Sequence, residues 1–260
     1  MHHLSCIHGY RVFALWPKAE VEPPRLLRLH RRRRIFLVCF LTSEEATEEI
    51  METIDVLLEQ HESTHGNLCP GTLLALRMAV LGCALVGIED PRGADKNKMI
   101  VWIEIDRWLA DAVEIVTGAR LGKRTLKFLD YGKLAASFLN RETGKAVRIV
   151  ALESSRRLAD LRHQEIEDKF ERQMRTYREA AEEELFGVTN VEVQVRAKDL
   201  PGHPRSRVTC DKCGEGVNDG REISLPDRIT LCRPCVYGPD YQPQQKFVTT
   251  RRHEQAMQSA

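Results

Sequence analysis

The sequence predicts an α+β protein with three parts: a layered helix and sheet core domain, a long helix, and a small C-terminal module built on four cysteines. Three observations support this prediction. Between residues 43 and 150, apolar residues recur at helical spacing in some segments and form short strand-like runs in others. A charged stretch with a single apolar stripe follows at 152–185. Two closely spaced cysteine pairs lie near the C-terminus.

The composition is that of an ordinary globular protein. The chain has 260 residues, of which 42% are hydrophobic and 30% charged, with a net charge of +1. These values exclude a disulfide-stapled miniprotein and an intrinsically disordered chain. The apolar run at 35–41 is too short for a membrane span, which needs about 20 residues. Paired cysteines without an export signal predict a reducing, cytoplasmic location and no membrane.

The N-terminal segment differs in charge from the rest of the chain. Residues 1–34 hold eight basic residues and two acidic ones, and the segment lacks sustained periodicity. We therefore expect residues 1–42 to form a basic, disordered arm. Residues 241–260 are expected to form a flexible tail.

The core domain, predicted at 43–200, begins with a helix. Ser43 offers an N-cap before two acidic residues, and apolar residues follow at helical spacing to Leu58. A second helix at 71–88 is apolar on most sides, which predicts a buried central helix. The remaining elements are a strand at 99–105, a helix at 108–117, and strands at 125–129 and 146–150. Mixed helices and strands of this kind form layered domains.

Residues 152–185 contain no glycine or proline. Their apolar residues are spaced three to five apart, which predicts one long helix with one apolar stripe. Two interpretations stay open: the helix packs across its own domain, or it forms a dimer interface. A Pro-Gly-His-Pro linker at 201–204 then ends the core domain.

Two CxxC pairs, Cys210 with Cys213 and Cys232 with Cys235, stand 18 residues apart. This spacing predicts a zinc ribbon at 205–240 in which four thiolates hold one Zn²⁺ tetrahedrally. Such a site has no open coordination position, so its role is structural. A redox pair or disulfides are the alternatives, but neither explains why two CxxC pairs occur at this spacing.

The charge of this module argues against nucleic acid as a partner. The segment 210–235 holds four basic and five acidic residues, before the charge of a tetrathiolate centre is added. Phosphate binding requires an excess of basic side chains. The basic N-terminal arm would have to supply nearly all of the attraction.

The core domain carries two further groups of candidate residues. His65 and Cys69 flank a turn before the buried helix, where a thiol is a candidate metal ligand or nucleophile. The alternative is a buried cysteine and a capping histidine. A candidate polar pocket takes its residues from the Gly- and Lys-rich turns, which are otherwise ordinary surface turns: Lys123, Asp130, Tyr131 and Lys133.

Several ordered motifs resemble the formylmethanofuran dehydrogenase E-subunit family (FmdE) over residues 50–238. They are the His65-Gly-x-x-Cys-Pro-Gly71 turn, the segment from Thr117-Gly118 to Lys133, Thr143–Arg148, Glu184–Phe186, and Cys213-Gly-Glu215. The resemblance implies an α+β core, a zinc ribbon and frequent dimerisation. It also implies an accessory role beside a molybdenum or tungsten enzyme that fixes CO2 onto methanofuran, with catalysis in separate chains.

The resemblance further implies a second metal in the core. The family's ligands are two histidines and a cysteine of an HGHxCPG turn, together with a later cysteine. In this chain His65 and Cys69 are retained, while Asn67 replaces the second histidine and Trp108 the later cysteine. Ala119 also stands where a cysteine commonly occurs in the family. The candidate second metal set is therefore His65 and Cys69, completed by Asp106, Glu104 or water.

Three functions follow from these observations. The favoured one is a metal-binding, homodimeric accessory protein that acts with oxidoreductase subunits or in one-carbon metabolism. The second is a nucleic-acid-binding or regulatory adaptor that uses the ribbon. The third is a small-molecule enzyme that uses Cys69 or a core metal.

Overall fold

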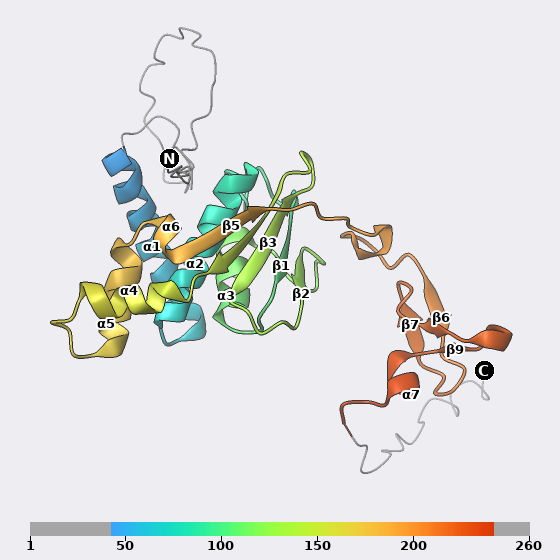
Figure 1. The fold of residues 1–260 in the computed structure, drawn as a ribbon. Helices are drawn as coiled ribbons and strands as arrows, with labels where there is room; N and C mark the ends of the chain where they lie inside the picture. The colour runs from blue at the N-terminus through green and yellow to red at the C-terminus, as the bar shows by residue number, and fades with distance from the viewer. Residues whose placement is uncertain (1–42, 242–260) are drawn as a thin grey trace, which may run out of the picture. The chain divides into compact units, whose positions relative to one another are not determined.

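The computed structural model describes residues 43–241 (Figure 1). The predicted basic arm and the predicted tail beyond residue 241 lie outside the described residues. In chain order, the elements of the core are α1 (Ser43–His65), α2 (Pro70–Val86), β1 (Met99–Ile103), α3 (Trp108–Thr117), β2 (Leu126–Phe128), β3 (Ala135–Asn140), β4 (Ala146–Ala151), α4 (Ser154–Arg162), α5 (Lys169–Glu179), α6 (Glu182–Leu185) and β5 (Phe186–Asn190). Between residues 43 and 241, no helix combines the length and the apolar character that crossing a membrane requires.

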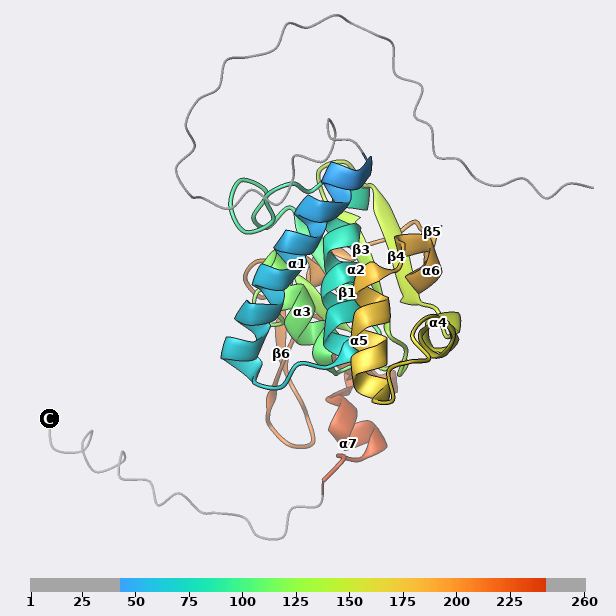
Figure 2. The ribbon, with the colours of Figure 1, turned by 90° about the vertical axis from the view of Figure 1, so that its left-hand side faces the viewer.

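One five-stranded sheet organises the core, with strand order β2-β1-β3-β4-β5. Strands β1 and β2 pair in parallel, and α3 connects them. The other three pairs are antiparallel. Helix α2 packs on β3 and β4, while α1 and α3 pack beside α2, so a helical layer covers one face of the sheet (Figure 2). The predicted α+β layered core is confirmed.

The central helix α2 has clear start and stop signals. Pro70 occupies the first turn, where its missing N–H costs nothing. Gly87 ends the helix in the left-handed conformation (φ 72°) that glycine adopts without strain. Its apolar side chains are buried almost all round, as predicted. At Gly82 the helix runs so close to the sheet that an added Cβ would lie 2.6 Å from the ring of Phe138.

The prediction of one long helix at 152–185 is wrong, because three short helices (α4, α5 and α6) occupy this segment. Helix α4 ends at Arg162, and the next residue is His163, whose buried imidazole lies 3.1 Å from the carboxylate of Glu179. Asp168 caps the start of helix α5, because its side chain accepts a hydrogen bond from the N–H of Glu171 (2.7 Å). The chain thus leaves the helical conformation without any glycine or proline, and a side-chain cap at Asp168 starts the next helix.

The segment of three helices is anchored to the core by Arg77, which is buried in α2. Its guanidinium donates to the carbonyl of Tyr177 (2.5 Å) and to the carboxylate of Glu182 (2.8 Å). Burial raises the pKa of Glu182 above its ordinary value, while the charge of Arg77 opposes this rise. The segment therefore packs across its own domain, the first of the two interpretations.

A second ion pair, between a buried carboxylate and a partly exposed guanidinium, joins strands that are not neighbours. Arg148 on β4 reaches across β3 and donates two hydrogen bonds, of 2.6 and 2.7 Å, to the carboxylate of Glu104 at the end of β1. Glu104 is only 4% exposed. Two parallel bonds between a guanidinium and a carboxylate are among the strongest polar contacts in proteins.

The C-terminal module consists of two small hairpins and a short helix. Strands β6 (Arg207–Thr209) and β7 (Gly216–Asn218) form the first hairpin, and β8 (Ile223–Ser224) and β9 (Thr230–Leu231) the second. Helix α7 (Arg233–Tyr237) follows. In the second hairpin Ile223 pairs with Leu231.

Candidate functional site

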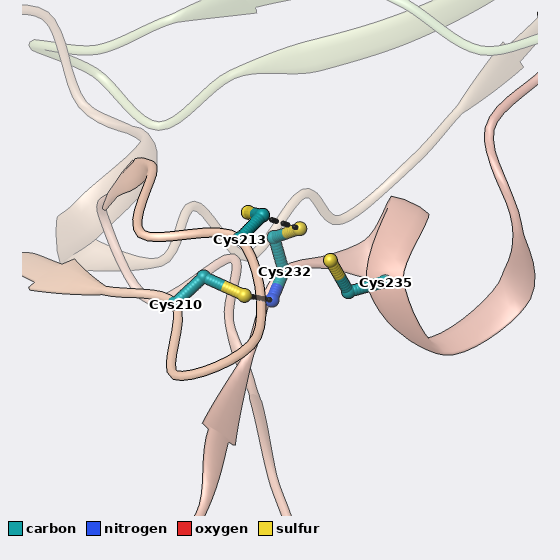
Figure 3. Close-up of side chains that lie close together, drawn as sticks. All are labelled: Cys210, Cys213, Cys232 and Cys235. Atoms are coloured by element: carbon teal, nitrogen blue, oxygen red, sulfur yellow. Dashed lines mark hydrogen bonds between the residues drawn. The ribbon is translucent and has the colours of Figure 1, made fainter. Parts of the chain in front are cut away.

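The four cysteines of the C-terminal module converge on one point. Cys210 and Cys213 lie in the turn between β6 and β7, and Cys232 and Cys235 lie at the start of α7 (Figure 3). Their sulfur atoms all lie within 4.8 Å of one another. Gly214 allows the first turn to close, because it adopts a φ of 76° and its N–H donates to the carbonyl of Cys210 (2.9 Å).

The sulfur spacing matches a tetrahedral metal site. The Sγ atoms of Cys213 and Cys232 are 3.8 Å apart, whereas a disulfide bond is about 2.05 Å long. A tetrahedron with zinc–sulfur bonds of about 2.3 Å has edges of about 3.8 Å. The donor set and its spacing therefore fit one tetrahedral ion of the zinc type.

The electrostatics of the cluster favour a bound cation. Hydrogen bonds from the backbone N–H groups of Cys213 and Cys232 lower the pKa of the Cys210 thiol to about 6. The neighbouring sulfur of Cys232, together with burial, raises the pKa of Cys235 to about 12. Closely packed sulfurs cannot all ionise on their own, because like charges repel. A divalent cation at their centre removes this repulsion and allows all four to become thiolates.

The predicted core ligands lie at three different places. His65 ends α1, Cys69 caps α2, and Asp106 lies exposed in the turn before α3. The Cys69 sulfur accepts a hydrogen bond from the N–H of Thr72 (3.4 Å), so the cysteine serves as the helix cap. Within residues 43–241, the four C-terminal cysteines are the only group of three or more metal-binding side chains whose ligand atoms lie within 4.8 Å of one another. The second metal set stays a prediction.

Sequence reasoning missed two residues beside His65. His61 lies one turn earlier on α1, with its ring centroid 5.0 Å from that of His65. Asp111 on α3 places a carboxylate oxygen 3.9 Å from Nδ1 of His65. Burial and the proximity of His65 lower the pKa of His61, which favours its neutral form, although Asp111 opposes the shift. The i, i+4 spacing of the two histidines was the available signal.

The four residues expected to form one polar pocket do not share a cavity. Lys133 lines a cavity of 520 Å³ that also contains Cys69 and Trp108. Lys123 lines another of 220 Å³, together with Arg92 and Arg120. Asp130 and Tyr131 lie exposed in the loop between β2 and β3.

A comparison with family models gives the identity of the core. The model described as "FmdE, Molybdenum formylmethanofuran dehydrogenase operon" matches residues 64–194, which is half of the chain. The chain belongs to the FmdE family. This confirms the resemblance drawn from the motifs. The matched range runs from the His65–Cys69 turn through β5, and the four-cysteine cluster lies beyond it.

Two individual proteins are similar to this FmdE family member. A "Probable S-adenosyl-L-methionine-binding protein" of Archaeoglobus fulgidus is 31% identical over 201 residues, covering 69% of this chain and 52% of the relative. This chain therefore spans about half the length of that relative. A crystal structure of an FmdE-like protein of the tungsten formylmethanofuran dehydrogenase type, from Syntrophus aciditrophicus, is 24% identical, with a TM-score of 0.49, covering 73% of this chain and 95% of the other.

Proposed function

We propose that this FmdE family protein is a zinc-binding accessory protein that serves a molybdenum or tungsten redox enzyme or one-carbon metabolism. The observation that carries the zinc assignment is the convergence of four cysteine sulfurs within 4.8 Å. The description of the matching family supports the link to a molybdenum enzyme. The protein acts in the cytoplasm as a homodimer, and its partners are oxidoreductase subunits.

The zinc has a structural role in this proposal. Four protein sulfurs fill the tetrahedral coordination of Zn²⁺ and leave no position for water or substrate. The strands around the cluster are short, with two or three residues each. So small a module buries little apolar surface, and metal binding then supplies much of its folding free energy.

Metal analysis of the full-length protein tests the zinc assignment. Native mass spectrometry should find zinc in the wild type, and Cys213→Ala or Cys235→Ala should lose the ion from the C-terminal module. Hydrogen exchange should then rise within residues 205–240 and stay unchanged in the sheet. Cys83→Ala is the matched control, because Cys83 lies buried in α2 and is not one of the four clustered cysteines. Full zinc retention in both cluster variants would reject the assignment.

Purification from the native cell tests the partner assignment. A tagged wild-type chain should recover oxidoreductase subunits, identified by mass spectrometry, together with molybdenum or tungsten. A homodimer recovered without any such subunit would count against an accessory role. This result is independent of the zinc content.

A second candidate function is small-molecule chemistry at Cys69. The observation in its favour is the 520 Å³ cavity that Cys69 lines together with Trp108 and Lys133. A cavity of this size suits a small ligand. In this case Cys69→Ala would abolish turnover of the substrate while the protein stays folded, and an unchanged rate would exclude the thiol from the chemistry.

A further inference from the structure

His61 is a buried histidine without hydrogen-bond partners. Its side chain is only 1% exposed, and neither ring nitrogen has a hydrogen-bond partner within the described residues. Leaving a buried polar group unpaired costs about 1–3 kcal/mol, so proteins seldom do so without reason. A bound ion or an ordered water is the usual reason.

Two metal-binding side chains lie next to His61. His65 follows one helical turn later, so both imidazoles lie on the same face of α1. Asp111 approaches from α3, with its carboxylate 3.9 Å from Nδ1 of His65. Two histidines at i, i+4 on one helix face are a recurring metal-binding pair, and a carboxylate from another element completes many such sites.

We propose that His61, His65 and Asp111 form a second metal site, for a divalent cation of the Zn²⁺, Ni²⁺ or Co²⁺ type. Imidazole and carboxylate ligands suit these ions, whereas the thiolate cluster selects zinc. The site lies at the C-terminal end of α1. It shares only His65 with the set implied by the family motif, and His61 takes the place of the histidine that Asn67 has replaced.

Metal binding requires the three side chains to move closer together. The ligand atoms of the three side chains do not all lie within 4.8 Å of one another. Two ligands held at about 2.1 Å from one ion lie about 3.4 Å apart, so at least one pair must approach by more than about 1.4 Å, whereas His65 and Asp111, at 3.9 Å, need only about half an ångström. Both side chains have room to turn, because His65 is 36% exposed and Asp111 is 40% exposed. His61 is buried and fixed, so it provides the rigid ligand that the two mobile side chains close upon.

Calorimetric titration with Ni²⁺ of the full-length protein, loaded with a single equivalent of Zn²⁺ per chain, tests this proposal. The four thiolates of the C-terminal cluster take that zinc, so the heat reports on the core. The wild type should bind one Ni²⁺ per chain. His61→Leu and His65→Ala should each weaken binding by at least about tenfold, because even indirect ligand contacts are worth 10- to 100-fold in affinity. Asp111→Asn should weaken it less, since the amide oxygen can still coordinate.

Two sets of control variants make the result specific. Cys69→Ala and Asp106→Asn remove the ligands that the family motif implies, and both should leave Ni²⁺ affinity unchanged. His203→Ala removes an exposed histidine of the linker and should also have no effect. Loss of binding in Cys69→Ala together with full binding in His61→Leu would overturn the proposal in favour of the motif set.

A stability measurement separates a metal site from a water site. His61→Leu removes both unpaired nitrogens, so the variant with one zinc per chain in the cysteine cluster should unfold at a higher urea concentration than the wild type in the same state. Added Ni²⁺ should stabilise the wild type and leave the variant unchanged. Equal responses of the two proteins to Ni²⁺, or no binding by the wild type, would overturn the proposal. Either result leaves the zinc content of the cysteine cluster, and thus the proposed function, unaffected.

Discussion

Replacing Gly82 with alanine tests how closely α2 is held to the sheet. The added Cβ would lie 2.6 Å from three ring carbons of Phe138. Carbon atoms in contact prefer a separation of about 3.5–4.0 Å. Phe138 is fully buried in β3, so its ring has no free space to turn into. Either the ring or the helix must therefore move by about 1 Å to restore that separation.

Two opposing effects set the size of the change at Gly82. Alanine is favoured over glycine inside a helix by about 1 kcal/mol. Overpacking a well-packed core costs about 1–3 kcal/mol, and displacing a fully buried ring belongs in the upper part of this range. We therefore expect Gly82→Ala to lower the free energy of unfolding by about 1–2 kcal/mol, although alanine is the better helix former.

Urea unfolding followed by tryptophan fluorescence measures this loss, because Trp102 and Trp108 lie in the core domain. Gly122→Ala is the control, since no atom lies within 4 Å of its added Cβ. In the Gly82→Ala/Phe138→Leu double variant, the smaller side chain should recover part of the loss. A gain of about 1 kcal/mol in the Gly82→Ala single variant would refute the reasoning, because helix propensity alone predicts that gain.

Three further predictions concern ion pairs and backbone conformation. Arg148→Met leaves the Glu104 carboxylate buried and unpaired, so it should lower the free energy of unfolding in urea by about 3 kcal/mol. Glu104→Gln keeps a hydrogen-bond acceptor and should lower it less. Equal losses in the two variants would contradict this account. Because the pKa of Glu182 is raised, its carboxyl binds a proton more tightly in the folded state, so stability should fall as the pH rises above 4.5. Glu182→Gln should therefore gain stability relative to the wild type over that range, and a difference that does not change with pH would exclude the effect. Gly118 ends α3 at a φ of 68°, so Gly118→Ala should cost about 1–2 kcal/mol in thermal unfolding, and no measurable loss would contradict the strain argument.

The elements with strong local signals could be predicted from the sequence. Helix α2 is predictable to within two residues at each end, because Pro70 and Gly87 mark its limits. Strand β1 is predictable as well, since its buried apolar run has few alternatives. In both cases local propensity and tertiary burial favour the same structure.

The elements that sequence patterns miss depend on contacts distant in the chain. Strand β3 has the sequence Ala-Ala-Ser-Phe-Leu-Asn, which is poor in strand-forming residues, and its identity comes from pairing with β1 and β4 on either side. The three helices at 154–185 look like one helix in the sequence because no glycine or proline marks their breaks, and the one side-chain cap among them, Asp168, is an ordinary polar residue.

The candidate sites also divide into residues with a local sequence signal and residues that only distant contacts bring together. All four cysteines of the C-terminal cluster are predictable, because each CxxC pair is a pattern of only four consecutive residues. By contrast, Asp111 meets His65 only because α3 packs beside α1, which no local pattern reveals. The signal for His61 is present in its spacing to His65, but only the structure shows that both of its nitrogens are buried without partners.

Strands β4 and β5 have a consequence for how this fold can vary. Ala151, the last residue of β4, pairs directly with Phe186, the first residue of β5. The intervening helical segment therefore leaves the sheet and returns to the same point, in the manner of a long hairpin loop. Loop-closure entropy changes only slowly with loop length, so this junction can accept segments of different length without disturbing strand register. It is the natural position at which to graft a foreign helical segment onto the sheet, or to shorten the chain, provided that the contacts of Arg77 are replaced.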